Sequence, residues 1–212
     1  MASTALTIAE ATDMFIEVAR SMVESQDLLT QADKAIGDGD HGIGMARGFE
    51  AVGQKLEAQP PATVGELLKS TGMTLMTSVG GASGAIFGIF FRGGAKNAGD
   101  RAQFDAQMLS LMLGDGLQAV QDRGKATPRD KTMVDALAPA ASRAAELAAS
   151  PLGEALPAAA EAARKGMEQT KDLVASIGKA KTLGERSLGH ADPGALSTYL
   201  ILKFMSDYVA RR

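Results

Sequence analysis

Three aspartates in the first part of the chain have the spacing of ligands for a divalent cation. Asp38 and Asp40 flank a single glycine, and Asp33 precedes them by slightly more than one helical turn. A tight turn at the glycine would aim both carboxylates at one point, where Asp33 can join them. Carboxylates in close quarters repel one another unless a hard cation offsets their charge, and carboxylate oxygens are the ligands that Mg²⁺ and Ca²⁺ prefer.

The kind of cation follows from what the segment lacks. A calcium-binding EF-hand loop that began at Asp38 would need glycine at its sixth position and glutamate at its twelfth, but Ile43 and Phe49 stand there. Mg²⁺ that bridges to phosphates fits better, because such sites combine few protein carboxylates with oxygens of the substrate. A solvated acidic turn, in which Asp40 caps a helix that starts at Ile43, is equally compatible with the spacing.

Most of the glycines gather in a few loops, at residues 37–44, 80–84, 124–128 and 184–194. A helix bundle does not need such loops in order to fold, but bare backbone N–H groups at the start of a helix form an anion site. We therefore expect the loops to share an anionic ligand. The second loop could cradle a phosphate, although it lacks the lysine of a Walker loop, and close packing between helices would explain the same glycines.

The two histidines, His41 and His190, also lie in these loops. His41 follows the acidic pair and could contact a phosphate, tune a metal or carry a phosphoryl group; a hydrogen-bonding role within its loop is the simpler alternative. Residues 192–194 predict a turn into a helix. By default, Met133 belongs to a helix core and Lys179 is a solvated surface residue.

Helices must position these loops. Aromatic residues make up 4% of the chain, and no run of alternating β-branched residues indicates a sheet. Thr7 with Glu10 predicts a capping box at the start of one helix, and Asp130 could cap another that runs through Met133. We expect an all-α protein of about eight helices joined by short loops, in a single domain that covers residues 1–212.

Composition excludes several classes of function. A net charge of −3 gives no support to a nucleic-acid-binding surface, and the absence of cysteine excludes disulfides, thiolate metal sites and a cysteine nucleophile. Residues 70–91 carry no charge and are long enough to cross a bilayer. Serine, threonine and glycine dilute them, so we expect a buried helix interrupted by a glycine turn and no membrane span. Residues 1–12 show no signal peptide, and we expect a cytoplasmic protein.

Four segments together resemble the L subunit of dihydroxyacetone kinase, the nucleotide-binding part of a glycerone kinase. They are residues 36–42, 78–84, 130–135 and 183–194; they occur in the family's order, and the resemblance covers essentially the whole chain. The resemblance implies a closed barrel or bundle of eight antiparallel amphipathic helices. In that fold, loops at one end would hold ADP or ATP through two Mg²⁺ ions.

The resemblance also implies roles for individual residues. The metal ligands would be Asp33, Asp38 and Asp40. Lys179 stands where the family has an arginine, and lysine keeps the charge but loses the planar fork that grips phosphate. Gly44 stands where the family commonly has asparagine. The nucleotide contacts would be His41, Gly42, Ile43, Gly44, Ala82, Ser83, Gly124, Met133, Lys179, Asp192, Pro193 and Gly194.

Partners follow from the same resemblance. A separate K subunit would hold a small ketose covalently on a histidine, and this chain would present the terminal phosphate of its nucleotide to the ketose hydroxyl. The phosphate would come from a phosphohistidine carrier of the sugar phosphotransferase system, the M subunit, which would recharge bound ADP. The alternative is an ATP-dependent kinase subunit for erythrulose or another small ketose. A nucleotide-responsive adaptor for a transcriptional regulator and a plain helical interaction module are the alternatives from other classes.

Overall fold

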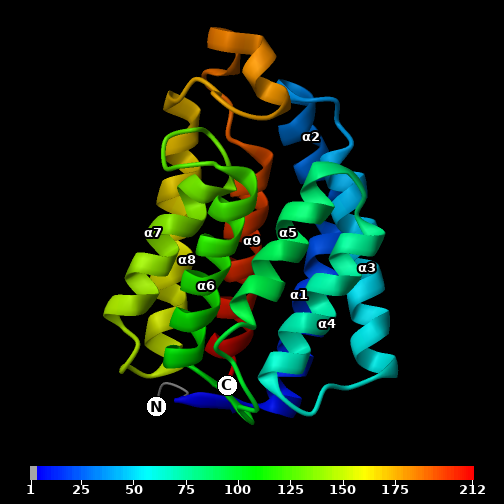
Figure 1. The fold of residues 1–212 in the computed structure, drawn as a ribbon, viewed down its shortest axis with the longest axis vertical. Helices are drawn as coiled ribbons and strands as arrows, with labels where there is room; N and C mark the ends of the chain where they lie inside the picture. Colours follow the sequence, from blue (N-terminus) through cyan, green and yellow to red (C-terminus); the bar gives the residue numbers. More distant parts are fainter. Residues whose placement is uncertain (1–3) are drawn as a thin grey trace.

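The computed structural model describes residues 4–212, and helices dominate this part of the chain (Figure 1). The expectation of an all-α protein is confirmed. Two short strands, β1 (Ala5–Thr7) and β2 (Gln103–Asp105), pair antiparallel and tie the start of the first helix to the start of the sixth. The α-helices are α1 (Ile8–Glu24), α2 (Gln26–Ile36), α3 (His41–Ala58), α4 (Val64–Ser78), α5 (Gly81–Gly94), α6 (Ala106–Gly124), α7 (Met133–Glu146), α8 (Leu152–Gln169) and α9 (Pro193–Ala210). Two 3₁₀ segments, η1 (Thr170–Asp172) and η2 (Lys179–Ser187), lie between α8 and α9.

Local sequence signals explain where the helices begin. Thr7 caps α1 as predicted: its hydroxyl accepts a hydrogen bond from the backbone of Glu10, whose carboxylate accepts one from the backbone of Thr7. The expected cap of α7 is wrong, because Thr132 caps this helix in place of Asp130. The Asp130 carboxylate instead accepts hydrogen bonds from the residue-127 backbone and from a serine hydroxyl at position 176.

The helices form an up-and-down bundle, in which each helix packs against the next along the chain and α9 returns to α1 (Figure 1). Within residues 4–212, α2 departs from this pattern, since it lies beside α3 at one end of the bundle. The expectation of a closed barrel is corrected to a bundle, because side chains fill the interior. The largest of them are phenylalanines with almost no exposed surface: Phe49, Phe87, Phe90, Phe91 and Phe104.

The uncharged stretch of residues 70–91 is divided between α4 and α5, as expected for a buried helix interrupted by glycine. The chain reverses at Gly80 and Gly81, whose φ angles of 79° and 59° lie in the left-handed region. Further along α5, a Cβ on Gly88 would lie 2.7 Å from the carbonyl oxygen of Gly72, so the two helices touch through their backbones. Across residues 4–212, the structure contains no helix with both the length and the hydrophobicity that a membrane span requires.

The alternation of helix direction gathers the positive ends of four helices. The N-termini of α3, α5, α7 and α9 all lie at the end of the bundle where α2 ends, the upper end in Figure 1. Each N-terminus presents backbone N–H groups that have no partner within the helix, together with the positive end of the helix dipole. This end of the bundle is therefore suited to binding an anion.

Candidate functional site

A cavity of about 450 Å³ opens among these four helix N-termini. One part of its wall is charged, with Asp33, Asp40 and Lys179, whereas Ile86 and Met133 contribute apolar surface. Twelve of the residues predicted from the sequence line this cavity: Asp33, Asp40, His41, Ile43, Gly44, Ala82, Ser83, Met133, Lys179, Asp192, Pro193 and Gly194.

Three predicted residues lie outside the cavity wall. Asp38 is not among the lining residues, but its carboxylate belongs to the acidic cluster described below. Gly42 faces α2, where a Cβ would lie 2.3 Å from the carbonyl oxygen of Gln26. Gly124 ends α6, and a Cβ there would lie 3.5 Å from Ile86. Gly42 therefore has a packing role in this structure.

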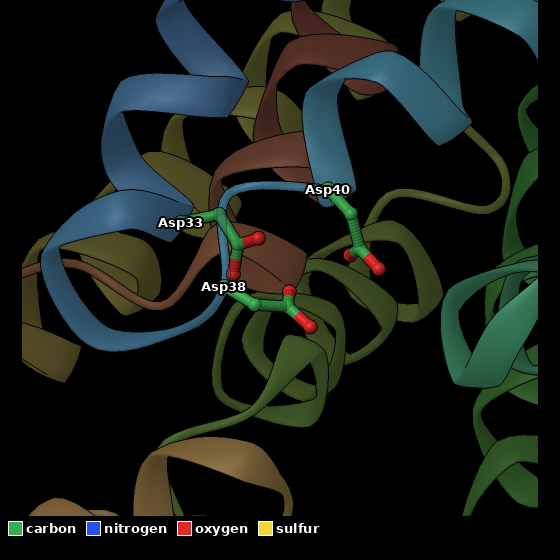
Figure 2. A group of neighbouring side chains, drawn as sticks. All are labelled: Asp33, Asp38 and Asp40. Carbon is green, nitrogen blue, oxygen red and sulfur yellow. The ribbon is translucent and has the colours of Figure 1, made fainter.

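The acidic cluster consists of Asp33, Asp38 and Asp40 (Figure 2). Asp33 projects from the last turn of α2, and the other two side chains come from the turn between α2 and α3. One carboxylate oxygen from each residue lies within 4.8 Å of the other two, so small side-chain rotations would let them share a cation. Gly39 makes this turn possible, since its φ of 79° lies in the left-handed region.

The chemistry of the cluster fits Mg²⁺. All three donors are hard carboxylate oxygens, the type that this ion prefers. The alternative role of Asp40 as a helix cap is not seen: α3 begins at His41, and the Asp40 side chain makes no capping hydrogen bond. Asp33 is buried, and one of its oxygens accepts a hydrogen bond from the backbone N–H of His41 at 3.1 Å. The protein thus fixes one ligand firmly and leaves two at the surface.

Lys179 reaches this cluster from η2, more than a hundred residues away in sequence. Its Nζ lies 2.5 Å from an oxygen of Asp38 and 3.4 Å from an oxygen of Asp40. The hydrogen bond between them raises the pKa of Lys179 and lowers the pKa of Asp38. Lys179 is therefore more than a solvated surface residue, because it offsets part of the negative charge that the cluster concentrates.

His41 connects three helices at the floor of the site. Its Nδ1 lies 3.0 Å from the hydroxyl of Ser83 at the start of α5, and its Nε2 lies 2.8 Å from the hydroxyl of Ser197 in α9. The residue is 7% exposed, and burial lowers the pKa of its ring. Both ring nitrogens are engaged by hydroxyl groups, which favours a neutral, positioning histidine over a phosphoryl carrier.

This environment predicts a pH dependence of stability. The folded state keeps the ring neutral, whereas the unfolded chain protonates it below the ordinary pKa of 6.5. The contribution of His41 is therefore complete above that value and is lost as the pH falls through the lowered pKa of the folded state. Between about pH 7.5 and about pH 5, wild type should therefore lose more unfolding free energy than His41→Gln, which has no titrating ring. Urea unfolding at both pH values measures this difference, and parallel losses in the two proteins would contradict it.

Arg47 holds the glycine turn that follows α4. Its Nε donates to the carbonyl of Ser78 at 2.7 Å, and a terminal nitrogen donates to the carbonyl of Val79 at 2.6 Å. These carbonyls belong to the C-terminus of α4, where a positive charge is favourable. This residue was not predicted from the sequence. Its position on α3 could have indicated a role at the site, since Arg47 shares a helix face with Ile43 and Gly44.

Residues 35–207 match a family model described as the DAK2 domain. The chain belongs to the DAK2 domain family. It is 42% identical to "PEP-dependent dihydroxyacetone kinase, ADP-binding subunit DhaL" of Escherichia coli (strain K12) over 182 residues, which are 85% of this chain and 87% of that protein. It is 32% identical to "L-erythrulose 1-kinase" of Mycolicibacterium smegmatis, with 97% of this chain covered but 38% of that protein.

Solved structures of dihydroxyacetone kinase share the fold of this DAK2-domain chain. The native dihydroxyacetone kinase of C. freundii superposes with a TM-score of 0.74 at 26% identity, over 98% of this chain and 35% of the other. The same kinase in complex with AMP-PNP and Mg²⁺ gives a TM-score of 0.73 at 27% identity, over 92% of this chain and 33% of the other. The predicted relation to the L subunit of dihydroxyacetone kinase is thus confirmed.

Proposed function

We propose that this chain is the nucleotide-binding, phosphoryl-transfer subunit of a dihydroxyacetone kinase. It would present the terminal phosphate of magnesium-bound ATP, formed by recharging bound ADP or taken up as ATP, to a ketose on a separate K subunit; ADP would remain after the transfer, and the chain would be inactive without that partner. The observation that carries the proposal is the convergence of Asp33, Asp38 and Asp40 beside a cavity framed by four helix N-termini. The ADP-binding subunits among its relatives support the choice of nucleotide.

The roles of the residues follow from their chemistry. Asp33, Asp38 and Asp40 would hold Mg²⁺, and we propose two ions. When bound, Mg²⁺ would neutralise charge on the phosphate oxygens. The N–H groups at the start of α5, including Ala82 and Ser83, would orient those oxygens. The apolar wall at Met133 would receive the base.

Other groups keep this arrangement in place. His41 ties the start of α3 to α5 and α9 through two serine hydroxyls. Arg47 fixes the carbonyls that precede the glycine turn. Lys179 balances the acidic cluster in the structure described here, and we propose that its ammonium turns to the phosphates when a cation occupies the carboxylates. The predicted contacts at the start of α9 would complete the cavity, and Gly124 would support its wall from behind Ile86.

We propose a phosphohistidine carrier as the phosphoryl donor, which would recharge bound ADP. Four relatives at 36% to 42% identity are named as PEP-dependent or PTS-dependent subunits. The alternative is an ATP-dependent kinase subunit for erythrulose or another small ketose, supported by two erythrulose kinases at 32% and 38% identity. A regulatory adaptor that binds nucleotide and contacts a transcriptional regulator is a further alternative. We also propose that residues 1–212 form one domain that acts in the cytoplasm, where both donors are found.

Reconstitution tests this function. The purified chain is mixed with the K subunit from the same organism and dihydroxyacetone, and dihydroxyacetone phosphate is measured with either ATP or a phosphorylated carrier protein as donor. We expect product only when both subunits are present, and with the carrier as donor. Product with ATP alone would favour the ATP-dependent alternative. Nucleotide binding without transfer from either donor would contradict the kinase proposal and favour the adaptor.

A further inference from the structure

A buried lysine joins the segments that form one side of the cavity. Lys131 precedes α7 by two residues and is 1% exposed. Its Nζ donates hydrogen bonds to the backbone carbonyls of Thr170 and His190, each at 2.5 Å. These two carbonyls belong to the segments that follow α8 and precede α9. One side chain therefore links the start of α7 to both ends of the chain segment between α8 and α9.

Thr170 extends this link to the start of α9. Its hydroxyl accepts a hydrogen bond from the backbone N–H of Asp192 at 2.9 Å. The Asp192 carboxylate in turn caps α9 by accepting from the N–H of Ala195 at 2.7 Å. Across this junction, a Cβ on Gly194 would lie 3.4 Å from the Cβ of Met133, so the starts of α7 and α9 are in contact.

The ammonium of Lys131 acts on backbone geometry more than on charge pairing. Both of its hydrogen-bond acceptors are carbonyl oxygens. Burial lowers the pKa of Lys131, while the carboxylates of Asp192, Asp135 and Asp172 act in the opposite direction. Burying a lysine is costly unless its donors are satisfied. Lys131 is nevertheless buried, at a position where its side chain holds three loop segments together.

The cavity wall that these segments form differs in chemistry from the acidic cluster. Met133 and Pro193 provide apolar surface here, beside the buried Lys131 and the half-buried Asp192, whereas Asp33, Asp40 and Lys179 line the charged part of the cavity. Phosphates and their cation belong with the charged groups, and a flat heterocyclic base gains most from apolar surface. The starts of α7 and α9 are therefore suited to the base and sugar of a nucleotide.

We propose that Lys131 is a positioning residue for nucleotide recognition, which sets the base-binding wall by holding the starts of α7 and α9 together. The inference rests on the proposed function, because it assumes that the cavity binds a nucleotide. It adds that the affinity for the base depends on Lys131, which lines the cavity with only 1% of its surface exposed. Affinity for the phosphates alone is set by the acidic cluster and Lys179 and does not depend on Lys131.

Calorimetric titration with two ligands tests this division. Lys131→Met removes the ammonium and keeps the length of the side chain. In the presence of Mg²⁺, we expect its dissociation constant for ADP to rise by on the order of tenfold, about 1.4 kcal/mol, because the contacts of the base with the displaced wall are weakened. The dissociation constant for inorganic pyrophosphate, which has no base, should stay within about twofold of wild type, less than half a kcal/mol. Lys69→Met, at an exposed lysine on α4, is the matched control and should change neither constant.

Each outcome bears on a separate claim. Equal weakening of ADP and pyrophosphate, or no weakening of ADP, would overturn the role of Lys131. Failure of the wild-type protein to bind ADP would instead overturn the proposed function. Lys131→Gln, which keeps a hydrogen-bond donor, should recover part of the ADP affinity and replaces the methionine variant if circular dichroism shows that variant to be unfolded. If neither variant folds, Lys131 is a folding residue and the proposal is wrong.

Discussion

Replacement of Asp38 by asparagine is expected to abolish magnesium-dependent nucleotide binding and to leave the fold intact. Asn keeps the size of the side chain but removes the negative charge that a hard cation requires. The side chain of Asp38 is 52% exposed, and its ion pair with Lys179 lies at the surface, so little stability depends on it. We expect the dissociation constant for ADP in Mg²⁺ to rise at least about 100-fold, the upper end of what loss of an outer-shell partner costs a metal site.

Asp27→Asn provides the matched control, since this aspartate is exposed on the same helix as Asp33 but belongs to no acidic cluster. Calorimetric titration of ADP into each protein, with thermal unfolding recorded beside it, measures both expectations. Binding retained by Asp38→Asn would remove this carboxylate from the metal site. Loss of binding together with loss of the folded state would mean that the acidic turn has a structural role.

Gly42→Ala should produce the largest loss of stability at the site. A Cβ at this position would lie 2.3 Å from the carbonyl oxygen of Gln26 and 2.5 Å from the backbone nitrogen of Thr30, so α3 must move away from α2. We expect a loss of about 3 kcal/mol, the upper end for overpacking. For a chain of this length, that loss corresponds to a decrease of roughly 6–12 °C in the midpoint of thermal unfolding. The same movement would shift Asp40 and His41 and weaken nucleotide binding.

Gly53→Ala on the same helix is the control for this substitution. There a Cβ would meet only the Cβ of Ala19 at 3.6 Å, which is an ordinary contact. Because alanine favours a helix over glycine by roughly 0.5–1 kcal/mol, this variant should unfold at the same temperature as wild type or higher. Similar midpoints for the two variants would show that α2 and α3 are not packed through Gly42.

The parts of the site that could be predicted from the sequence are those set by neighbouring residues. The acidic turn depends on two aspartates around a glycine with positive φ, and Thr7 caps α1 through a residue three positions away. The glycine turn between α4 and α5 follows for the same reason. In each case the interacting groups are a few residues apart, so their spacing along the sequence determines how they lie relative to one another.

Contacts between distant segments could not be predicted in this way. Lys131 meets a carbonyl 39 residues away, and Lys179 meets a carboxylate 141 residues away. Nothing in the local sequence of Lys131 distinguishes it from a solvated lysine. The wrong cap of α7 has a related cause: Lys131 has a φ of 60°, which ends the loop one residue before Thr132, and Asp130 is engaged elsewhere. The partner of a buried lysine and the residue that caps a helix depend on how the helices pack, and the spacing of residues along the sequence does not encode this packing.

Calorimetric titration of the wild-type protein with ADP, after removal of any bound nucleotide, tests the central claim most directly. The titration is made once with Mg²⁺ and once with EDTA. If the three carboxylates hold a cation that binds the phosphates, ADP should bind tightly with Mg²⁺, and EDTA should weaken this binding at least about 100-fold. ADP binding of equal strength in both conditions, or no binding in either, would contradict the account of this site.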